Sequence, residues 1–287
     1  MPHTPSPLRY PGGKTSICNM VAKIIVDNDL CRGHYIEPYA GGCGLALSLM
    51  FKGHVHELHL NDIDRSICSF WNAILNQTED FIEKIRSTPV TIDEWHAQRQ
   101  VQDNKSDADD FQLAFSSFFL NRTNRSGVIV KAGAIGGLSQ DGDYKIDCRF
   151  HKENLIEKIK RIAKYKHRIH FYNMDALDFI DHVKKFLPKE KSFFCIDPPY
   201  YVKGSTLYAN FYEPKDHQDI AKELLKLNRP WVLTYDNAPE IQDLYKTKRQ
   251  YLFNLNYSAA TKRVGTELLV ASDDLIISPT LKLAAVA

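Results

Sequence analysis

The sequence predicts an α/β protein whose doubly wound, mostly parallel sheet is interrupted by one insertion. Short apolar strands alternate with helices before residue 76 and again after residue 165. Over residues 76–165 this alternation stops, and amphipathic helical patterns take its place. We therefore expect residues 1–75 and 166–287 to form one domain and residues 76–165 to form an inserted, mostly helical domain.

The segment before the insertion has the pattern strand, glycine loop, helix. It reads HYIEPYAGGCGLALSLMF from residue 34, and Pro38 stops the strand because proline cannot donate to a sheet ladder. Three glycines, Gly41, Gly42 and Gly44, make the tight loop before the helix. The expected elements are a helix over 16–30, a strand ending at Glu37, a helix from Leu45, a strand over 55–60 and a helix over 66–75.

The insertion and the second part of the chain are assigned in the same way, from the period of the apolar residues. Helical spacing occurs over 78–87, 91–101 and 108–121 within the insertion. The segment 135–147, which is rich in glycine, predicts a hairpin. Beyond it we expect strands over 168–174, 193–196, 230–237, 250–257 and 267–271, with helices over 217–227 and 239–246.

Composition and charge exclude several classes of protein. The chain is 44% hydrophobic and 25% charged, which is typical of a soluble globular protein. A net charge of +2 gives no global signal for nucleic acid, although a basic run lies at 152–168. The six cysteines have no zinc-type or redox spacing, and no apolar leader or membrane span is apparent. We therefore expect a cytoplasmic protein.

Four acidic residues fall at the ends of four predicted strands: Glu37, Asp62, Asp175 and Asp197. Parallel strands bring their carboxyl ends to one edge of the sheet, where ligands bind in open α/β folds. Asp197 begins the sequence DPPY directly after the apolar run FFCI. The pattern predicts a rigid acidic corner beside an aromatic ring.

The glycine loop indicates what this edge binds. A phosphate-binding loop carries a lysine, but GGCG has none and follows an acid. This favours a ligand that carries positive charge, such as an amine or a sulfonium. S-adenosylmethionine has both, together with a ribose that Asp62 could hold and an adenine that Asp175 could hold.

The order of these motifs resembles that of the Dam-type N6-adenine-specific DNA methyltransferases, the alpha class of amino-methyltransferases with a DPPY motif. The matching segments are PGGK (11–14), EPYAGGCG (37–44), NDID (61–64), FFLNRTNRSG (118–127), MD (174–175), DPPY (197–200) and ELLVAS (267–272). The resemblance implies a Rossmann-like, S-adenosylmethionine-dependent methyltransferase sheet in which the insertion is the target-recognition domain.

The resemblance also implies a cofactor site. Glu37 would meet the methionine amine, Asp62 the ribose hydroxyls and Asp175 the adenine amine. Lys14 would meet the methionine carboxylate or organise the pocket. The cofactor-binding residues implied are Tyr10, Lys14, Glu37, Pro38, Gly41, Gly42, Gly44, Asp62, Asp175, Ala176 and Asp197.

The catalytic residues implied are Asp197, Pro198, Pro199 and Tyr200. Asp197 and the Pro198 carbonyl would each accept one N–H of the target adenine amine, and Tyr200 would offer a ring face to the base. Because a stacked adenine cannot reach this corner, the base would be flipped out of duplex DNA. The DNA-binding residues implied are Asn121, Arg122, Asn124, Arg125, Tyr201, Lys203 and Tyr208.

Other interpretations of the sequence stay open. A methyltransferase acting on RNA adenine would use the same corner, and a catalytically silent subunit would keep the fold but lose a motif residue. The histidines of HVHELH (54–59) do not predict a metal site, because no ligand cluster is evident around them. We expect a monomer, with a cognate restriction endonuclease as a possible partner; segment 135–147 departs from the pattern of GATC-specific relatives.

Overall fold

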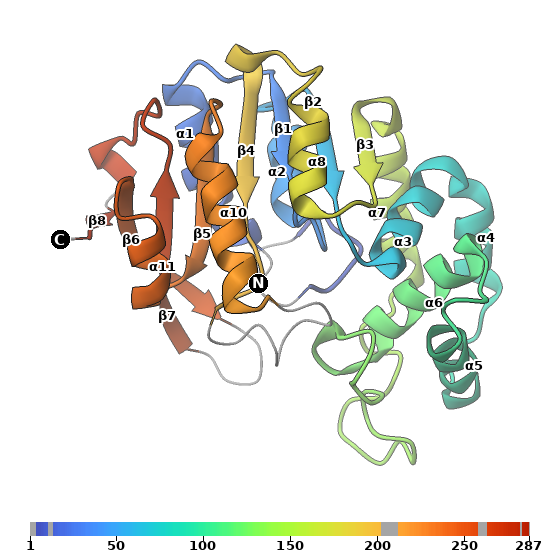
Figure 1. The fold of residues 1–287 in the computed structure, drawn as a ribbon. Coiled ribbons are helices and arrows are strands. Elements are labelled where there is room, and N and C mark those ends of the chain that lie inside the picture. Colours follow the sequence, from blue (N-terminus) through green and yellow to red (C-terminus); the bar gives the residue numbers. More distant parts are fainter. Residues whose placement is uncertain (1–3, 11–13, 202–211, 258–262, 282, 287) are drawn as a thin grey trace.

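The computed structural model describes residues 4–10, 14–201, 212–257, 263–281 and 283–286. It confirms an α/β fold built on one eight-stranded mixed sheet, with a helical insertion beside the sheet (Figure 1). Among the described residues, no helix is long and apolar enough to cross a membrane.

The sheet has the strand order β3-β2-β1-β4-β5-β7-β6-β8. The strands from β3 to β5 are parallel, while β7 lies antiparallel between β5 and β6. All parallel strands therefore present their carboxyl ends at one edge. The bounds are β1 His34–Glu37, β2 Glu57–Asn61, β3 Ile169–Tyr172, β4 Ser192–Ile196, β5 Trp231–Asp236, β6 Arg249–Tyr257, β7 Arg263–Ala271 and β8 Ala284–Ala285.

Helices cover both faces of the parallel part, so most residues of β1, β2, β4 and β5 are buried. Tyr35 packs into the cluster under α1, α2 and α3, whereas its neighbour Ile36 packs into the cluster under α8, α10 and α11. The bounds are α1 Cys18–Asp27, α2 Gly44–Phe51, α3 Arg65–Asn76, α8 Ala176–Val183, α10 Pro214–Lys226 and α11 Pro239–Leu244. Short 3-10 turns are η1 Lys14–Ile17, η2 Arg125–Gly127, η3 Lys166–Arg168, η4 Lys189–Lys191 and η5 Pro279–Leu281.

The insertion packs onto the sheet domain through α3. The Phe118 ring stacks on the Phe70 ring with centroids 5.7 Å apart, so the insertion and the sheet share one continuous buried cluster. Side-chain caps set two helix starts: Thr91 accepts from the Glu94 N–H, and Asp109 accepts from the Gln112 N–H. The bounds are α4 Thr78–Ser87, α5 Ile92–Asp103, α6 Asp110–Thr123 and α7 Lys152–Ala163.

The hairpin expected over 135–147 is wrong, because that segment contains no strand. Its turns are held by the side chain of Gln140. The amide of Gln140 donates to the Ile135 carbonyl at 2.8 Å and accepts from the Ile146 N–H at 2.8 Å. These local bonds satisfy backbone groups that a ladder would otherwise pair.

Candidate active site at the carboxyl edge of the sheet

Three of the four acidic residues at strand ends form one group. Glu37 ends β1, Asp62 follows β2 and Asp197 follows β4, and the charges of Asp197 and Asp62 both act on Glu37. Asp175 lies apart from this group in its contacts: it is exposed, and it caps α8 by accepting from the Leu177 N–H at 2.8 Å. Its exposed position still leaves it open to a ligand at the edge.

The glycine loop is held against the ring of Tyr10. Gly41 has a φ of +46°, and its N–H donates to Asp62 Oδ2 at 3.0 Å. A Cβ atom at Gly42 would lie 2.7 Å from the Tyr10 Cβ, and one at Gly44 would lie 2.3 Å from the Thr15 hydroxyl. Side chains would therefore push these segments apart, so the glycines are needed for the close approach.

Asn61 connects two loops of the edge. Its buried amide donates to the carbonyls of Pro38 at 3.1 Å and Met174 at 3.0 Å, and it accepts from the Met174 N–H at 2.9 Å. The next residues, Asp175 and the buried Ala176, begin α8. The three motifs at the ends of β1, β2 and β3 are thus fixed at a set spacing before any ligand binds.

Lys14 lies in a buried network of charges and hydrogen bonds. Its ammonium is 2.9 Å from Glu267 Oε2 and 3.2 Å from Asp197 Oδ1, and it donates to the Tyr200 hydroxyl at 2.9 Å. The Tyr200 hydroxyl donates to Glu267 Oε1 at 2.6 Å. Lys14 thus holds Asp197, Tyr200 and Glu267 together. Both roles expected for it, contact with the methionine carboxylate and organisation of the pocket, stay predictions.

Glu267 is the residue of this network that the sequence did not single out. It is fully buried on β7, opposite Asp236 at the end of β5. The segment ELLVAS (267–272) resembles the family's sequence, but nothing in its pattern predicts that Glu267 reaches the acidic corner.

The DPPY corner fixes one oxygen of Asp197, and the described part of the chain provides no partner for the other. Asp197 Oδ1 accepts from the Thr234 hydroxyl at 2.8 Å as well as facing Lys14. No described residue bonds to Oδ2, and the side chain is 17% exposed. Burial raises the pKa of Asp197 to about 6; Lys14 opposes this shift, and the charge of Glu267 adds to it. The carboxylate is thus an acceptor at neutral pH.

Tyr200 differs from its expected role. The side chain is only 4% exposed, its hydroxyl is bonded within the network, and the Lys14 ammonium lies 5.0 Å from the ring centroid. The ring therefore has no open face for a base in this conformation. The structure gives Tyr200 a supporting contact, and stacking on it would require exposure of the ring.

Two carboxyl groups at this edge, those of Glu37 and Asp62, are shifted towards their neutral forms. Glu37 is 6% exposed, and among the described residues its Oε2 atom has no hydrogen-bond partner. Burial, followed by the charge of Asp197, raises its pKa well above the usual range. Burial also raises the pKa of Asp62 to about 7. An uncompensated carboxylate in such a place is costly, so the site suits a ligand that carries positive charge.

Two residues expected to bind DNA have a structural role. Asn121 is fully buried and accepts from the Arg9 N–H, while its amide donates to the carbonyls of Arg9 and Gly127. Asn124 is also fully buried, and its oxygen accepts from the Trp95 indole at 2.6 Å. Both amides are bonded within the protein in the absence of DNA, and a contact of either with DNA stays a prediction.

The remaining residues expected to bind DNA vary in exposure. Arg122 is half-buried and donates to the Arg149 and Pro7 carbonyls. Arg125 is exposed, and Tyr201 is half-buried with its N–H bonded to Asp236. Lys203 and Tyr208 lie outside the described residues, as do residues 11–13 of the PGGK motif.

Comparison with known proteins identifies the family of the chain. The family model of the D12 class N6 adenine-specific DNA methyltransferases matches residues 10–262. A curated relative, the Type II methyltransferase M.MjaIII of Methanocaldococcus jannaschii, is 25% identical over 242 residues, which cover 77% of this chain and 80% of the relative. The family match spans most of the chain, from Tyr10 through the glycine loop and DPPY. The chain therefore belongs to the D12 class of N6-adenine-specific DNA methyltransferases.

Proposed function

We propose that the chain transfers a methyl group from S-adenosylmethionine to the N6 amine of an adenine flipped out of a short, specific duplex DNA sequence. The observation that carries this proposal is the state of Asp197: Lys14 and Thr234 fix one oxygen, and no residue that the structure describes bonds to the other. The family implies the cofactor and the DNA substrate. The residue roles below are our inference from the geometry.

The carboxylates suit the proposed cofactor. S-adenosylmethionine supplies an electrophilic methyl group on a positively charged sulfur, and it also carries an ammonium. Glu37, with its unpartnered buried oxygen, would bind the ammonium, while Asp62 would accept from the ribose hydroxyls. The glycines at 41, 42 and 44 allow the backbone to approach this ligand closely. Asp175 and Ala176 lie at the start of α8, where the adenine of the cofactor would be held.

The corner would make the target amine nucleophilic by directing its hydrogens. The N6 lone pair of adenine is delocalised into the ring, so the free amine is a poor nucleophile. If Asp197 Oδ2 and the Pro198 carbonyl each accept one N–H, the nitrogen is drawn towards tetrahedral geometry with its lone pair facing the methyl group. Proline at 198 and 199 restricts the backbone that aims this carbonyl. Asp197 is also placed to take the proton that the methylated nitrogen releases.

The pH dependence of cofactor binding tests the role of Asp62. The pKa of Asp62, raised to about 7, predicts that protonation below neutrality removes an ionised acceptor for the ribose. We expect affinity for S-adenosylmethionine to fall by up to about tenfold per pH unit between about pH 7 and about pH 6. Titration calorimetry at several pH values measures this fall. Asp62→Asn should bind more weakly at about pH 8 and lose most of the dependence; an unchanged dependence in this variant would assign it to another group.

A cluster of cations beside the N-terminal segment is our proposed phosphate-binding surface. Burial, followed by the charges of Arg9 and Arg149, lowers the pKa of Arg122 to about 10, and burial together with Arg122 lowers the pKa of Lys158. Like charges gather in this way at sites that meet an anion. With exposed Arg125, they would contact the DNA backbone, and residues 76–165 would act as the target-recognition domain.

Salt dependence of DNA binding tests this surface. Arg149→Ala removes an exposed cation that is not part of the corner. We expect weaker binding to all duplexes and a slope of log K against log salt that is smaller by about 1. Lys185→Ala, a change of the same charge at an exposed lysine after α8, serves as the control and should leave the slope unchanged. Equal slopes for wild type and Arg149→Ala would rule out this phosphate contact.

The substrate is tested directly by methyl transfer from labelled S-adenosylmethionine to duplex DNA, with single-stranded DNA and RNA as comparators. Mapping of the modified bases should place N6-methyladenine at one short motif. Label in RNA alone would favour the alternative of an RNA methyltransferase, and cofactor binding without any transfer would favour a silent subunit. The name of the M.MjaIII relative supports a restriction partner that cuts at the same site, and we propose a monomer because one chain supplies the whole corner.

A further inference from the structure

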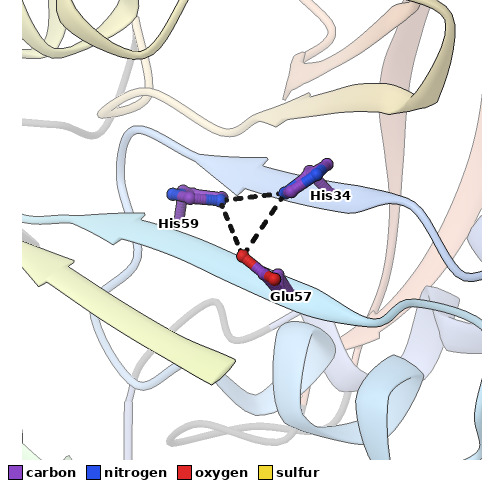
Figure 2. Close-up of side chains that lie close together, drawn as sticks. All are labelled: His34, Glu57 and His59. Atoms are coloured by element: carbon purple, nitrogen blue, oxygen red, sulfur yellow. Dashed lines mark hydrogen bonds and ion pairs between the residues drawn. The ribbon is translucent and has the colours of Figure 1, made fainter. Parts of the chain in front are cut away.

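A cluster of metal-ligand side chains lies on the sheet away from the DPPY corner. It consists of His34 on β1 and of Glu57 and His59 on β2, and Figure 2 shows the three side chains directed towards one point. His34 and Glu57 are the first residues of their strands, whereas the acidic corner lies at the opposite, carboxyl ends. The cluster is therefore separate from the methyl-transfer site.

Strand register and pleat bring the three side chains together. β1 and β2 pair in parallel with His34 opposite Glu57, and His59 lies two residues beyond Glu57 on the same face. The intervening Leu58 faces the core on the other side. HVHELH was not expected to hold a metal, because no ligand cluster was evident around it. The cluster takes only Glu57 and His59 from that segment, and His34 from another strand completes it.

The distances match the spacing of ligands around one ion. His34 Nδ1 is 3.2 Å from His59 Nε2, and Glu57 Oε2 is 3.6 Å from the first nitrogen and 3.8 Å from the second. A tetrahedral zinc ion with bonds of about 2.0–2.2 Å places its ligand atoms about 3.3–3.6 Å apart. We propose that these three atoms bind one divalent transition-metal ion, with Zn²⁺ the best match to two imidazoles and a carboxylate.

His59 lies at the buried side of the cluster, with its side chain only 3% exposed. A neutral imidazole nitrogen is a common metal ligand, and two of them beside a carboxylate make a donor set that suits Zn²⁺.

His170 on β3 provides support from the neighbouring strand. Its Nε2 atom is 3.2 Å from Glu57 Oε2, and its ring stacks on that of His59 with centroids 4.8 Å apart. These contacts orient two of the three ligands, as groups around a metal site commonly do. The side chains of His34, Glu57 and His170 are 23%, 31% and 40% exposed, which leaves a path for the ion and for a water as the fourth ligand.

An ion here would link β1 to β2 at the amino end of the sheet. Because none of its ligands contacts the acidic corner, we infer a structural role. The ion should raise the midpoint of thermal unfolding, while methyl transfer well below that midpoint should stay the same after chelation.

Metal titration of the full-length protein tests the site. After chelator treatment, Zn²⁺ is titrated by calorimetry, and Co²⁺ is added as a spectroscopic probe whose intense visible bands report tetrahedral coordination. The wild type should bind one ion per chain and give these bands. Glu57→Gln, which keeps the size of the side chain, and His34→Ala should each weaken binding at least tenfold and abolish the bands. His96→Ala removes an exposed histidine on α5 as the matched control and should behave as the wild type.

Two results would overturn the inference. One is the absence of stoichiometric binding by the wild type. The other is equal affinity in the wild type, Glu57→Gln and His34→Ala, which would show that ions bind elsewhere and that the cluster is a set of hydrogen-bonded neutral histidines. Because Glu57→Gln changes only the charge of a half-exposed side chain, it is expected to fold even if His34→Ala does not.

Discussion

Asp197→Ala is expected to slow methyl transfer to duplex DNA by about 10²–10³-fold, the usual effect of removing one directed polar contact from a transition state. The variant loses the acceptor that aims the amine, but the Lys14–Glu267 ion pair remains, so the fold should persist. Affinity for S-adenosylmethionine should change far less than the rate. Single-turnover assays with labelled cofactor give the rate, and calorimetry gives the affinity.

Thr234→Val is the graded control for this experiment. It keeps the Asp197 carboxylate but removes the 2.8 Å hydrogen bond to Oδ1, so the rate should fall less than in Asp197→Ala. A rate for Asp197→Ala within about tenfold of the wild type would show that the corner does not direct the amine.

Lys14→Met is expected to destabilise the protein by about 3–5 kcal/mol, because it leaves the carboxylates of Asp197 and Glu267 without their shared cation in a buried site. Urea unfolding measures this loss. Removing Lys14 should raise the pKa of Asp197 further above its value of about 6, so the carboxyl would stay protonated closer to neutrality. The lower limb of the pH profile for methyl transfer should then move to higher pH.

The sign of the pH effect on stability distinguishes this cause from a packing defect. A carboxyl whose pKa is raised in the folded state binds more protons there than in the unfolded chain, so stability increases as pH falls through that folded pKa. The cost of Lys14→Met should therefore shrink as pH falls from the higher pKa of Asp197 in the variant towards about 6, its value in the wild type, and should change little below that. The double variant Lys14→Met/Glu267→Gln should recover part of the loss at neutral pH. No recovery and no pH dependence would attribute the loss to packing alone.

The sequence was sufficient to predict the acidic edge, because parallel strands in an α/β fold bring their carboxyl ends to the same edge of the sheet. An apolar strand followed by Glu37, Asp62 or Asp197 needs only parallel pairing to bring these groups to one edge. The pairing order did not have to be known. Asp175 was placed at the same edge by the same rule, and its cap on α8 follows from its position before a helix.

The sequence was not sufficient where a role depends on a long-range partner. Glu267 reaches the corner because β7 inserts antiparallel between β5 and β6. The spacing of apolar residues along the sequence predicts strands but not their order in the sheet. Asn121 and Asn124 occupy a polar-looking segment, yet their amides bind backbone groups of neighbouring loops. The His34–Glu57–His59 cluster depends on interstrand register in the same way, which a pattern within HVHELH cannot reveal.

The Lys14 network also has a consequence for when activity arises during synthesis. The ammonium of Lys14 and the carboxylate of Glu267 are 253 residues apart in the chain, and Asp197, Tyr200 and Thr234 come from two further segments. While β7 is still inside the ribosome, the chain lacks the Glu267 carboxylate that binds both Lys14 and Tyr200. Since domains fold as the chain emerges, the cofactor loop can form early, whereas competence for transfer must wait for the last strands.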